Sequence, residues 1–305
     1  MGEVELTIFE EEKKMKRLIT ICVIAVLLMV GSSKAALLGY TVKLGSDESP
    51  IVCKTNFTTG SQVSLGPSSM PSGPSDWFYS LALSPSDGYL YASTWNDGLW
   101  QINPATGAST KLSLIPSPGA NPQGHIVPLL GSQSRLAFSP AGTLYGTGPY
   151  YDESDSLATI DLSTKQTTVI KRYLEYTVGG LCGFAIDQSG QAIGVSNCPD
   201  PRGNGGYVTS LLNISLFDGR IATGQLWNSP SNGFYSLCYG PDGTLYGDTG
   251  GYRQLYTINT QNLSASPIGV PFNGDVPFVI TPEPATLLLL GLGGLLFRKK
   301  RSYCS

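Results

Sequence analysis

The sequence predicts an all-β protein, a β-propeller of five blades with four antiparallel strands each, between an N-terminal signal helix and a C-terminal hydrophobic helix. Three observations lead to this fold class. Apolar segments of four to six residues recur between turns rich in Gly, Pro, Ser and Thr, and no part of the body has a long helical period. Turn glycines stand at positions 88, 142, 190 and 243, which are 54, 48 and 53 residues apart. A repeat of about 50 residues has the length of one propeller blade.

Each repeat begins with a predicted hairpin of two apolar strands. Residues 78–91 contain Phe-Tyr-Ser-Leu, then Pro-Ser-Asp-Gly, then Leu-Tyr, and residues 234–246 repeat this order almost unchanged. Residues 136–145 and 184–193 carry shorter versions of the pattern. Asp-Gly or its equivalent between two apolar runs indicates a two-residue turn of type I′, because both central residues of that turn need a positive φ. We therefore expect a tight turn at each glycine.

A second pair of strands follows each hairpin at a similar distance along the chain. The first strand of this pair contains an isoleucine and ends in Asn, Asp or Ser. Five residues beyond the isoleucine lies a turn, marked by Thr106-Gly107 in one copy and Asp218-Gly219 in another, and a fourth strand follows. The predicted third strands are Leu99–Asn103, Leu157–Asp161, Leu211–Ser215 and Leu255–Asn259.

A fifth, partial copy of the repeat lies at the start of the body. Ile51–Asn56 and the Thr59-Gly60 turn match the third strand and turn of the next repeat, but a clear innermost strand is missing. Val276–Ile280, at the other end of the body, is apolar enough to supply that strand and close the ring. Six blades are the alternative if residues 116–134 form strands of their own. A β-sandwich of unrelated hairpins is the other alternative.

The last 25 residues, 281–305, have the order of a membrane-inserted signal. Pro282, Glu283 and Pro284 precede an apolar run, Leu287–Phe297, which is shorter than the roughly 20 residues of a full bilayer span. Proline does not fit inside a helix, so the predicted helix begins after the tripeptide. Four cations follow the run; they hold that end in the cytoplasm and leave everything upstream outside. These cations are Arg298, Lys299, Lys300 and Arg301.

This tail resembles the PEP-CTERM sorting signal, in which Pro-Glu-Pro stands before a hydrophobic helix and an Arg-rich end. The resemblance covers about 20 residues and joins three ordered parts. It implies export in a Gram-negative-type bacterium, transient anchoring in the inner membrane by the C-terminal helix, and recognition by an exosortase, a membrane-embedded, transpeptidase-like cysteine enzyme. It also implies a final place at the cell surface or outside the cell, linked to exopolysaccharide. The alternative is a plain C-terminal membrane anchor, which predicts a longer span and no pair of prolines.

The N-terminal segment has the features of a secretory signal. Basic residues precede thirteen mostly apolar residues, Leu18–Val30, and small residues follow, so we expect a signal peptidase to cleave between Ala35 and Ala36. The first fourteen residues hold five glutamates, unlike the basic start of a signal, which makes Met15 a second candidate for the true start. An uncleaved anchor is the alternative. The predicted domains are the signal peptide (1–35), the propeller body (36–280) and the sorting signal (281–305).

Composition limits what the exported body binds. Residues 36–282 hold ten Lys and Arg against sixteen Asp and Glu, a formal charge of −6, so nucleic acid is not an expected partner. In an oxidising compartment we expect Cys182 and Cys198 to form a disulfide, while Cys53 and Cys238 either pair or stay buried thiols. No Cys or His spacing indicates a metal site. Ca²⁺ is compatible with the acidic loops, but no calcium-loop motif appears, so no cofactor is predicted.

The irregular sequence gathers at one end of the predicted ring, in the loops between strands 2 and 3 and in the links between blades. Long loops on a rigid scaffold are where binding usually resides. Aromatic residues beside acids and Asn suit a sugar ring with its hydroxyls, or a cation. The candidate ligand-binding residues are Trp95, Asn96, Asp97, Tyr150, Tyr151, Asp152, Asp200, Asp248 and Tyr252.

Most catalytic constellations are missing from the sequence. The one histidine, His125, lies in a link rich in Pro and Gly, and no Gly-x-Ser-x-Gly motif occurs. We therefore expect a non-enzymatic, surface-sorted propeller that binds an extracellular partner such as polysaccharide. One alternative is a carbohydrate-active or lactone-active propeller enzyme that uses the loop carboxylates of Asp97, Asp152, Asp200 and Asp248. The other is a structural matrix protein that needs no specific ligand.

Overall fold

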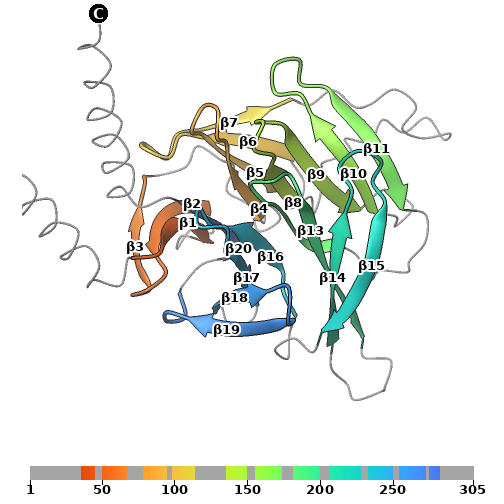
Figure 1. The fold of residues 1–305 in the computed structure, drawn as a ribbon. Coiled ribbons are helices and arrows are strands. Elements are labelled where there is room, and N and C mark those ends of the chain that lie inside the picture. Colours follow the sequence, from red (N-terminus) through yellow and green to blue (C-terminus); the bar gives the residue numbers. More distant parts are fainter. Residues whose placement is uncertain are drawn as a thin grey trace, which may run out of the picture. The chain divides into compact units, whose positions relative to one another are not determined.

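The structure, a computed structural model, describes twenty β-strands and the turns that join them (Figure 1). The chain divides into two compact units, Met1–Ala36 and Leu37–Ser305, and every described strand belongs to the second. The predicted terminal helices lie outside the described residues. Within the described part, no helix has the length and hydropathy needed to cross a bilayer. The described ranges are 36–44, 50–66, 78–94, 98–113, 135–149, 155–173, 181–199, 207–227, 233–249, 254–272 and 275–281.

The strands form five antiparallel sheets of four strands, which we number as blades and describe from the innermost strand outward. Blade 1 consists of β20 (Asp275–Ile280), β1 (Leu38–Leu44), β2 (Pro50–Asn56) and β3 (Ser61–Ser64). Blade 2 consists of β4 (Phe78–Leu83), β5 (Leu90–Thr94), β6 (Gly98–Ile102) and β7 (Ser109–Leu112). Blade 3 consists of β8 (Arg135–Phe138), β9 (Leu144–Pro149), β10 (Asp155–Ile160) and β11 (Thr167–Tyr173). Blade 4 consists of β12 (Leu181–Ile186), β13 (Ala192–Pro199), β14 (Tyr207–Ile214) and β15 (Ile221–Trp227). Blade 5 consists of β16 (Ser236–Tyr239), β17 (Leu245–Asp248), β18 (Leu255–Asn259) and β19 (Ser264–Ile268).

The innermost strands of the five blades form a closed ring. β4 neighbours β8, β8 neighbours β12, β12 neighbours β16, β16 neighbours β20, and β20 neighbours β4 again. A sandwich of two sheets contains no such ring, so the sandwich alternative is wrong. The predicted five-bladed propeller is confirmed (Figure 1). Residues 116–134, on which the six-bladed alternative depends, lie outside the described part.

The ring closes where the last strand of the body pairs with the first. β20 lies antiparallel to β1, with Ile280 opposite Gly39. The N–H of Thr281 then donates to the carbonyl of Leu38 over 2.9 Å, and the Thr281 hydroxyl donates to the same oxygen over 3.3 Å. On the other side, the N–H of Ile280 donates to the Cys238 sulfur of blade 5 over 3.5 Å. The predicted closing strand is therefore confirmed.

The inner hairpins turn differently from the two-residue type I′ turns predicted for them. In blade 3, Gly142 donates its N–H to the carbonyl of Ser139, and Ser139 donates its N–H to the carbonyl of Thr143. Three residues thus form the loop, and Gly142 has a φ of 84°. Pro140, like Pro241 in blade 5, favours this turn because proline fixes the negative φ that the second residue of a type I turn requires, while blade 4 makes the same turn with Gln188 at that position. The glycine position was predicted correctly, and the turn type was wrong.

The outer turns, between the third and fourth strands, share one backbone conformation in all five blades. The residue in the left-handed region is glycine in three blades, Lys165 (φ 62°) in blade 3 and Leu263 (φ 55°) in blade 5. A side-chain oxygen stabilises the turn in blade 5, where Asn259 accepts hydrogen bonds from the N–H groups of Gln261 and Asn262. An Asx turn of this kind lets a non-glycine residue follow in a strained conformation.

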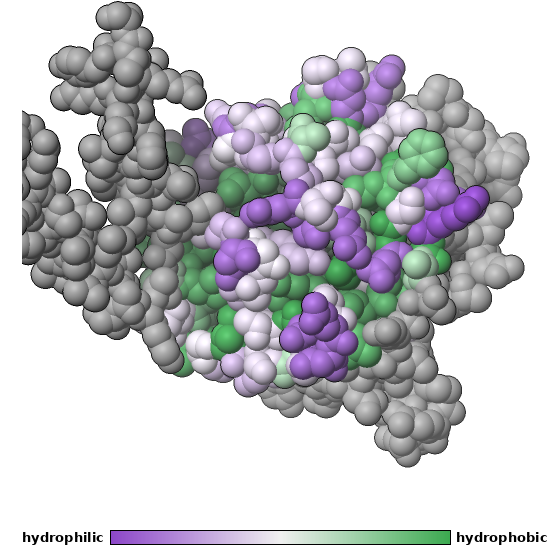
Figure 2. Space-filling view, in the orientation of Figure 1, coloured by the Kyte–Doolittle hydropathy of each residue, from purple (hydrophilic) through white to green (hydrophobic). Residues whose placement is uncertain are grey.

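The apolar core is divided among the five junctions between neighbouring blades. Each of the five buried clusters takes side chains from two adjacent blades; in the junction of blades 5 and 1, for example, Phe57 and Phe278 meet Leu255. Hydrophilic residues are spread over the face visible in Figure 2, with hydrophobic residues between them. Because a blade buries its faces only against its neighbours, each blade depends on the closed ring.

One buried arginine connects three blades. Arg135, at the start of β8, is 8% exposed. Its Nε donates to the carbonyl of Cys182 in blade 4 over 2.5 Å, and its Nη1 donates to the carbonyl of Tyr79 in blade 2 over 2.7 Å. The guanidinium carbon also lies 5.1 Å from the centre of the Tyr79 ring. Charged donors make stronger hydrogen bonds than neutral ones, so this side chain holds the inner strands together.

Removing β20 should prevent the ring from forming. A body that ends at residue 274 loses the partner of β1 and the buried Phe278. Loss of one buried Phe costs about 3–5 kcal/mol, against a total stability of about 5–15 kcal/mol for a domain. We expect the body of residues 36–281 to unfold cooperatively in urea and to resist protease, and the body ending at residue 274 to do neither. Equal unfolding midpoints for the two would contradict the closure.

Replacing Arg135 by Met should lower the free energy of unfolding by about 3–6 kcal/mol, because two charge-assisted hydrogen bonds worth about 1.5–3 kcal/mol each are lost. The measurement is urea unfolding of residues 36–281. Lys171→Met is the matched control, since Lys171 is exposed in the outer strand of blade 3 and its loss should change stability by less than about 0.5 kcal/mol. If both variants behave alike, Arg135 does not hold the blades together.

Candidate functional site

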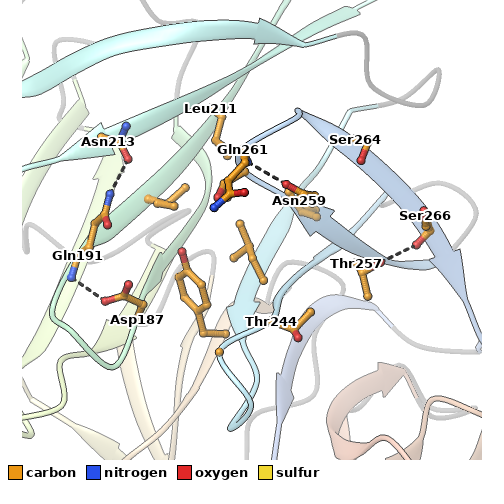
Figure 3. Close-up of a pocket in the computed structure, with 16 residues that line it drawn as sticks. Asp187, Gln191, Leu211, Asn213, Thr244, Thr257, Asn259, Gln261, Ser264 and Ser266 are labelled. Atoms are coloured by element: carbon orange, nitrogen blue, oxygen red, sulfur yellow. Dashed lines mark hydrogen bonds between the residues drawn. The ribbon is translucent and has the colours of Figure 1, made fainter.

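A polar cleft opens between blades 4 and 5 at the end of the ring that carries the tight turns (Figure 3). Its volume is about 870 Å³. Blade 4 supplies the turn before β13 and parts of β13 and β14, and blade 5 supplies the turn before β17, β18, β19 and the turn between them. The polar side chains that line the cleft are Asp187, Gln191, Asn213, Tyr239, Thr244, Thr257, Asn259, Thr260, Gln261, Ser264 and Ser266.

The turn between β12 and β13 holds the Asp187 carboxylate. Oδ1 accepts the backbone N–H of Ser189 over 2.9 Å, the Ser189 hydroxyl over 2.7 Å and the backbone N–H of Gln191 over 2.8 Å. Partial burial raises the pKa of Asp187, but these hydrogen bonds outweigh it, and the pKa lies below its ordinary value. The group is therefore an anion at neutral pH, and the second oxygen, Oδ2, is available to accept from a ligand.

Tyr239 faces Asp187 from the opposite blade. It is the last residue of β16 and is half-buried. Burial raises the pKa of Tyr239 to about 12, and the nearby carboxylate of Asp187 adds to the rise. The phenol consequently stays protonated at neutral pH and acts as a hydrogen-bond donor. Beside this pair, the Gln191 amide donates to the Asn213 carbonyl oxygen over 3.0 Å, which orients both amides (Figure 3).

The opposite wall of the cleft is neutral and rich in hydrogen-bonding groups. Asn259 is held by its turn, and the Thr257 hydroxyl donates to the carbonyl of Ser266 over 3.4 Å. Ser264 is exposed, and its hydroxyl donates to Asn262. Among the described side chains that line the cleft, Asp187 alone carries a charge. The cleft therefore offers many donors and acceptors and a single negative charge.

The central channel opens beside the cleft. It is lined by the five inner strands, has a volume of about 340 Å³ and is mostly apolar. Pro85, Pro140 and Pro241, each in an inner turn, lie around its opening. Asp187 and Tyr239 line both the channel and the cleft. The carboxylate and the phenol thus stand where the two hollows meet.

The segment directly after β20 contains a known sorting motif. Residues 281–301 match the family model of the PEP-CTERM protein-sorting motif. The chain carries a PEP-CTERM sorting signal. This match confirms the resemblance seen in Pro282, Glu283 and Pro284. The motif marks an exported protein that is anchored in a membrane, processed by an exosortase and placed at the surface.

Solved structures resemble the body of this PEP-CTERM protein at low sequence identity. A chain in the crystal structure of a nidogen/laminin complex is 10% identical with a TM-score of 0.50, over 81% of this chain and 98% of that one. A catalytically inactive virginiamycin B lyase from Staphylococcus aureus with quinupristin is 14% identical (TM-score 0.42), over 78% and 72% of the two chains. TolB from Acinetobacter baumannii is 13% identical (TM-score 0.43), over 77% and 53%. The first likeness supports the fold alone. No curated protein sequence matches the chain.

The loop site predicted for this PEP-CTERM protein lies almost wholly outside the described residues. Asp248 is the exception: it is the last residue of β17 rather than a loop residue, and its side chain is 1% exposed. The binding role of the other loop residues stays a prediction. The predicted residues outside the described part are Trp95, Asn96, Asp97, Tyr150, Tyr151, Asp152, Asp200 and Tyr252.

The cleft at the tight-turn end was missed by sequence reasoning. One signal pointed to it: Asp187 is a carboxylate at a position where the inner turns of the neighbouring repeats have Ser139 and Gly240. Such a departure from the repeat indicates a role beyond the turn itself. The amides at positions 191, 213 and 261 come from separate strands and turns, so no spacing in the sequence connects them.

The remaining sequence predictions have different outcomes. The side chain of Cys198 lies outside the described ones, so the disulfide between Cys182 and Cys198 stays a prediction. Cys53 and Cys238 are thiols; burial raises the pKa of Cys238 to about 11. No group of metal-binding side chains occurs among the described residues. The signal cleavage site, His125 and the four terminal cations lie at or beyond the edges of the described ranges.

Proposed function

We propose that this exported, exosortase-targeted propeller is a non-enzymatic binding protein for extracellular polysaccharide, and that the glycan occupies the cleft between blades 4 and 5. The observation that carries this proposal is the lining of the cleft. It combines amides, hydroxyls, one ionised carboxylate and one phenol around a volume of about 870 Å³. Ligand pockets for small molecules have about 300–1,000 Å³, so the cleft has room for a few sugar units.

The cleft chemistry suits a ligand made of hydroxyl groups. Each sugar hydroxyl both donates and accepts, as do the amides of Gln191, Asn213 and Gln261. Oδ2 of Asp187 accepts hydrogen bonds from one or two neighbouring hydroxyls of the sugar, and such charge-assisted hydrogen bonds are strong. Tyr239 adds an aromatic face and a donor. These groups come from both walls, so a chain of sugars in the cleft contacts both blades.

The negative charge of the cleft predicts which class of polysaccharide binds there. Asp187 is ionised at neutral pH, and the cleft lining described here holds no cation. A uronic acid polymer places a carboxylate beside this anion without a compensating charge, which costs free energy in a partly buried site. We therefore assign the cleft to neutral glycans with adjacent free hydroxyls.

A binding role is favoured over hydrolysis by the number of carboxylates. Glycoside hydrolysis needs two carboxyl groups, about 5 to 9.5 Å apart, that act as acid and as nucleophile or base. The described lining of the cleft contributes one, Asp187. The geometry therefore supports recognition of the sugar chain, and hydrolysis by loop carboxylates finds no specific support in the described residues.

Replacement of Asp187 tests the proposed site. We expect residues 36–281 to bind dextran or mannan at least tenfold more tightly than alginate or polygalacturonate. Asp187→Asn should weaken binding of the neutral polymer at least tenfold, about 1.4 kcal/mol. It should also reduce the ratio between the affinities for the neutral and the acidic polymers. Asp218→Asn is the matched control, because Asp218 lies in an exposed turn of the same blade, paired with Arg220 and away from the cleft. The measurement is isothermal titration calorimetry; absence of binding to all four polymers, or turnover of any of them, would refute the proposal.

A change at Glu283 tests whether the tripeptide is read as a signal. Gln has the size of Glu and tolerates the same backbone, so a tripeptide that merely ends a helix should accept it. We expect Glu283→Gln to leave the tail attached and the protein in the membrane fraction, measured by intact mass and fractionation in a host with the sorting enzyme. Equal tail removal from the wild type and from a variant with alanine at 282–284 would contradict recognition of the tripeptide.

A further inference from the structure

The sorting tail leaves the propeller beside the cleft. Ile280 ends β20, an inner strand, and the other inner strands end at the same place relative to the ring, where they enter the tight turns. Ile280 lines the channel opening together with Asp187 and Tyr239. Its N–H donates to the sulfur of Cys238, the residue before Tyr239. The tail therefore starts directly after a residue, Ile280, that is hydrogen-bonded to the neighbour of Tyr239, and Tyr239 lines the cleft.

The start of the body lies at the same end. Leu38 is the first residue of β1, and its carbonyl accepts the N–H of Thr281 over 2.9 Å. The N–H of Leu37 donates to the hydroxyl of Thr58, in the outer turn of blade 1, over 3.1 Å. The first strand of the body and the start of the sorting tail thus lie together at the tight-turn end of the propeller.

The connection between the propeller and the apolar run is short. Five residues, 282–286, separate Thr281 from Leu287. An extended chain covers at most about 3.3–3.6 Å per residue, so the two positions are no more than about 21 Å apart in any conformation. A rigid ring attached at one end by so short a connection keeps that end toward the bilayer.

We infer that the membrane-anchored precursor holds its cleft against the bilayer, and that removal of the apolar segment uncovers the cleft for polysaccharide. Until then, a polymer reaches the cleft only through the narrow space between ring and membrane, whereas the opposite end of the ring faces away. Ligand binding is in this way delayed until sorting is complete. The inference rests on the proposed function, because it concerns access to the same cleft.

The length of the connection provides the first test. Residues 36–305 are inserted through the apolar segment into vesicles of phosphatidylethanolamine and phosphatidylglycerol, and binding of dextran or mannan, whichever binds the free body of residues 36–281, is compared with that body. A second form carries about 30 Gly and Ser residues between Thr281 and Pro282, a flexible spacer of about 30 Å. The matched control carries the same spacer after Ser305. We expect the short form and the control to bind at least tenfold more weakly than the free body, and the internal spacer to restore binding to within threefold.

Chemical labelling tests the orientation without any glycan. Ser264→Cys places a thiol on the exposed rim of the cleft, and Lys171→Cys places one on the exposed outer strand of blade 3. We expect a maleimide on a bulky polyethylene glycol to label Cys at 264 at least fivefold more slowly in the anchored form than in the free body, with equal rates at 171.

The two tests separate the inference from the function on which it rests. Equal labelling at position 264 in the anchored and free forms would overturn the inference, as would full glycan binding by the short anchored form. If the free body binds no polymer while labelling at 264 is slowed by anchoring, the orientation stands and the proposed ligand is wrong.

Discussion

The hydrogen bonding of β20 to β1 is the interaction on which the rest of the structure depends. It joins Thr281 to Leu38, which are 243 positions apart in the sequence. Each blade buries its apolar side chains only against its two neighbours, so an open ring leaves two blades with uncovered faces. The last strand of the body fills the place beside the first strand. The propeller is consequently complete only when this last strand is in place.

The same closure brings the start of the sorting signal and the cleft to one end of the ring. Because β20 is an inner strand, its end lies at the opening of the central channel, where the tight turns of the other blades also lie. The cleft between blades 4 and 5 meets the channel there through Asp187 and Tyr239. The inner strand of blade 1 comes from the C-terminal end of the body. This topology therefore fixes where the tail starts relative to the cleft.

The cleft itself shows how a repeated scaffold acquires one particular site. The inner turns have nearly the same backbone in blades 3, 4 and 5, closed by the same pair of hydrogen bonds. In blade 4, Asp187 uses this turn to hold its carboxylate in the charged form, and the facing Tyr239 keeps its proton because of burial and that charge. Rigid turns thus place the polar groups, and Asp187 distinguishes the blade 4 turn from the turns of blades 3 and 5, which have Ser139 and Gly240 at that position.

The sequence by itself determined the repeat, the strands, the closing segment and the sorting signal, because each is a local pattern of apolar periodicity, turn residues or ordered motif. Even locally it was incomplete: the inner turns have three residues in blades 3, 4 and 5 and four in blade 2, where two were predicted, and nothing marked Lys165 and Leu263 as left-handed residues. The cleft was decided only by the tertiary structure. Asp187, Asn213, Tyr239 and the blade 5 turn come from four separate segments, and their meeting depends on how two blades pack around a closed ring, which no spacing along the chain encodes.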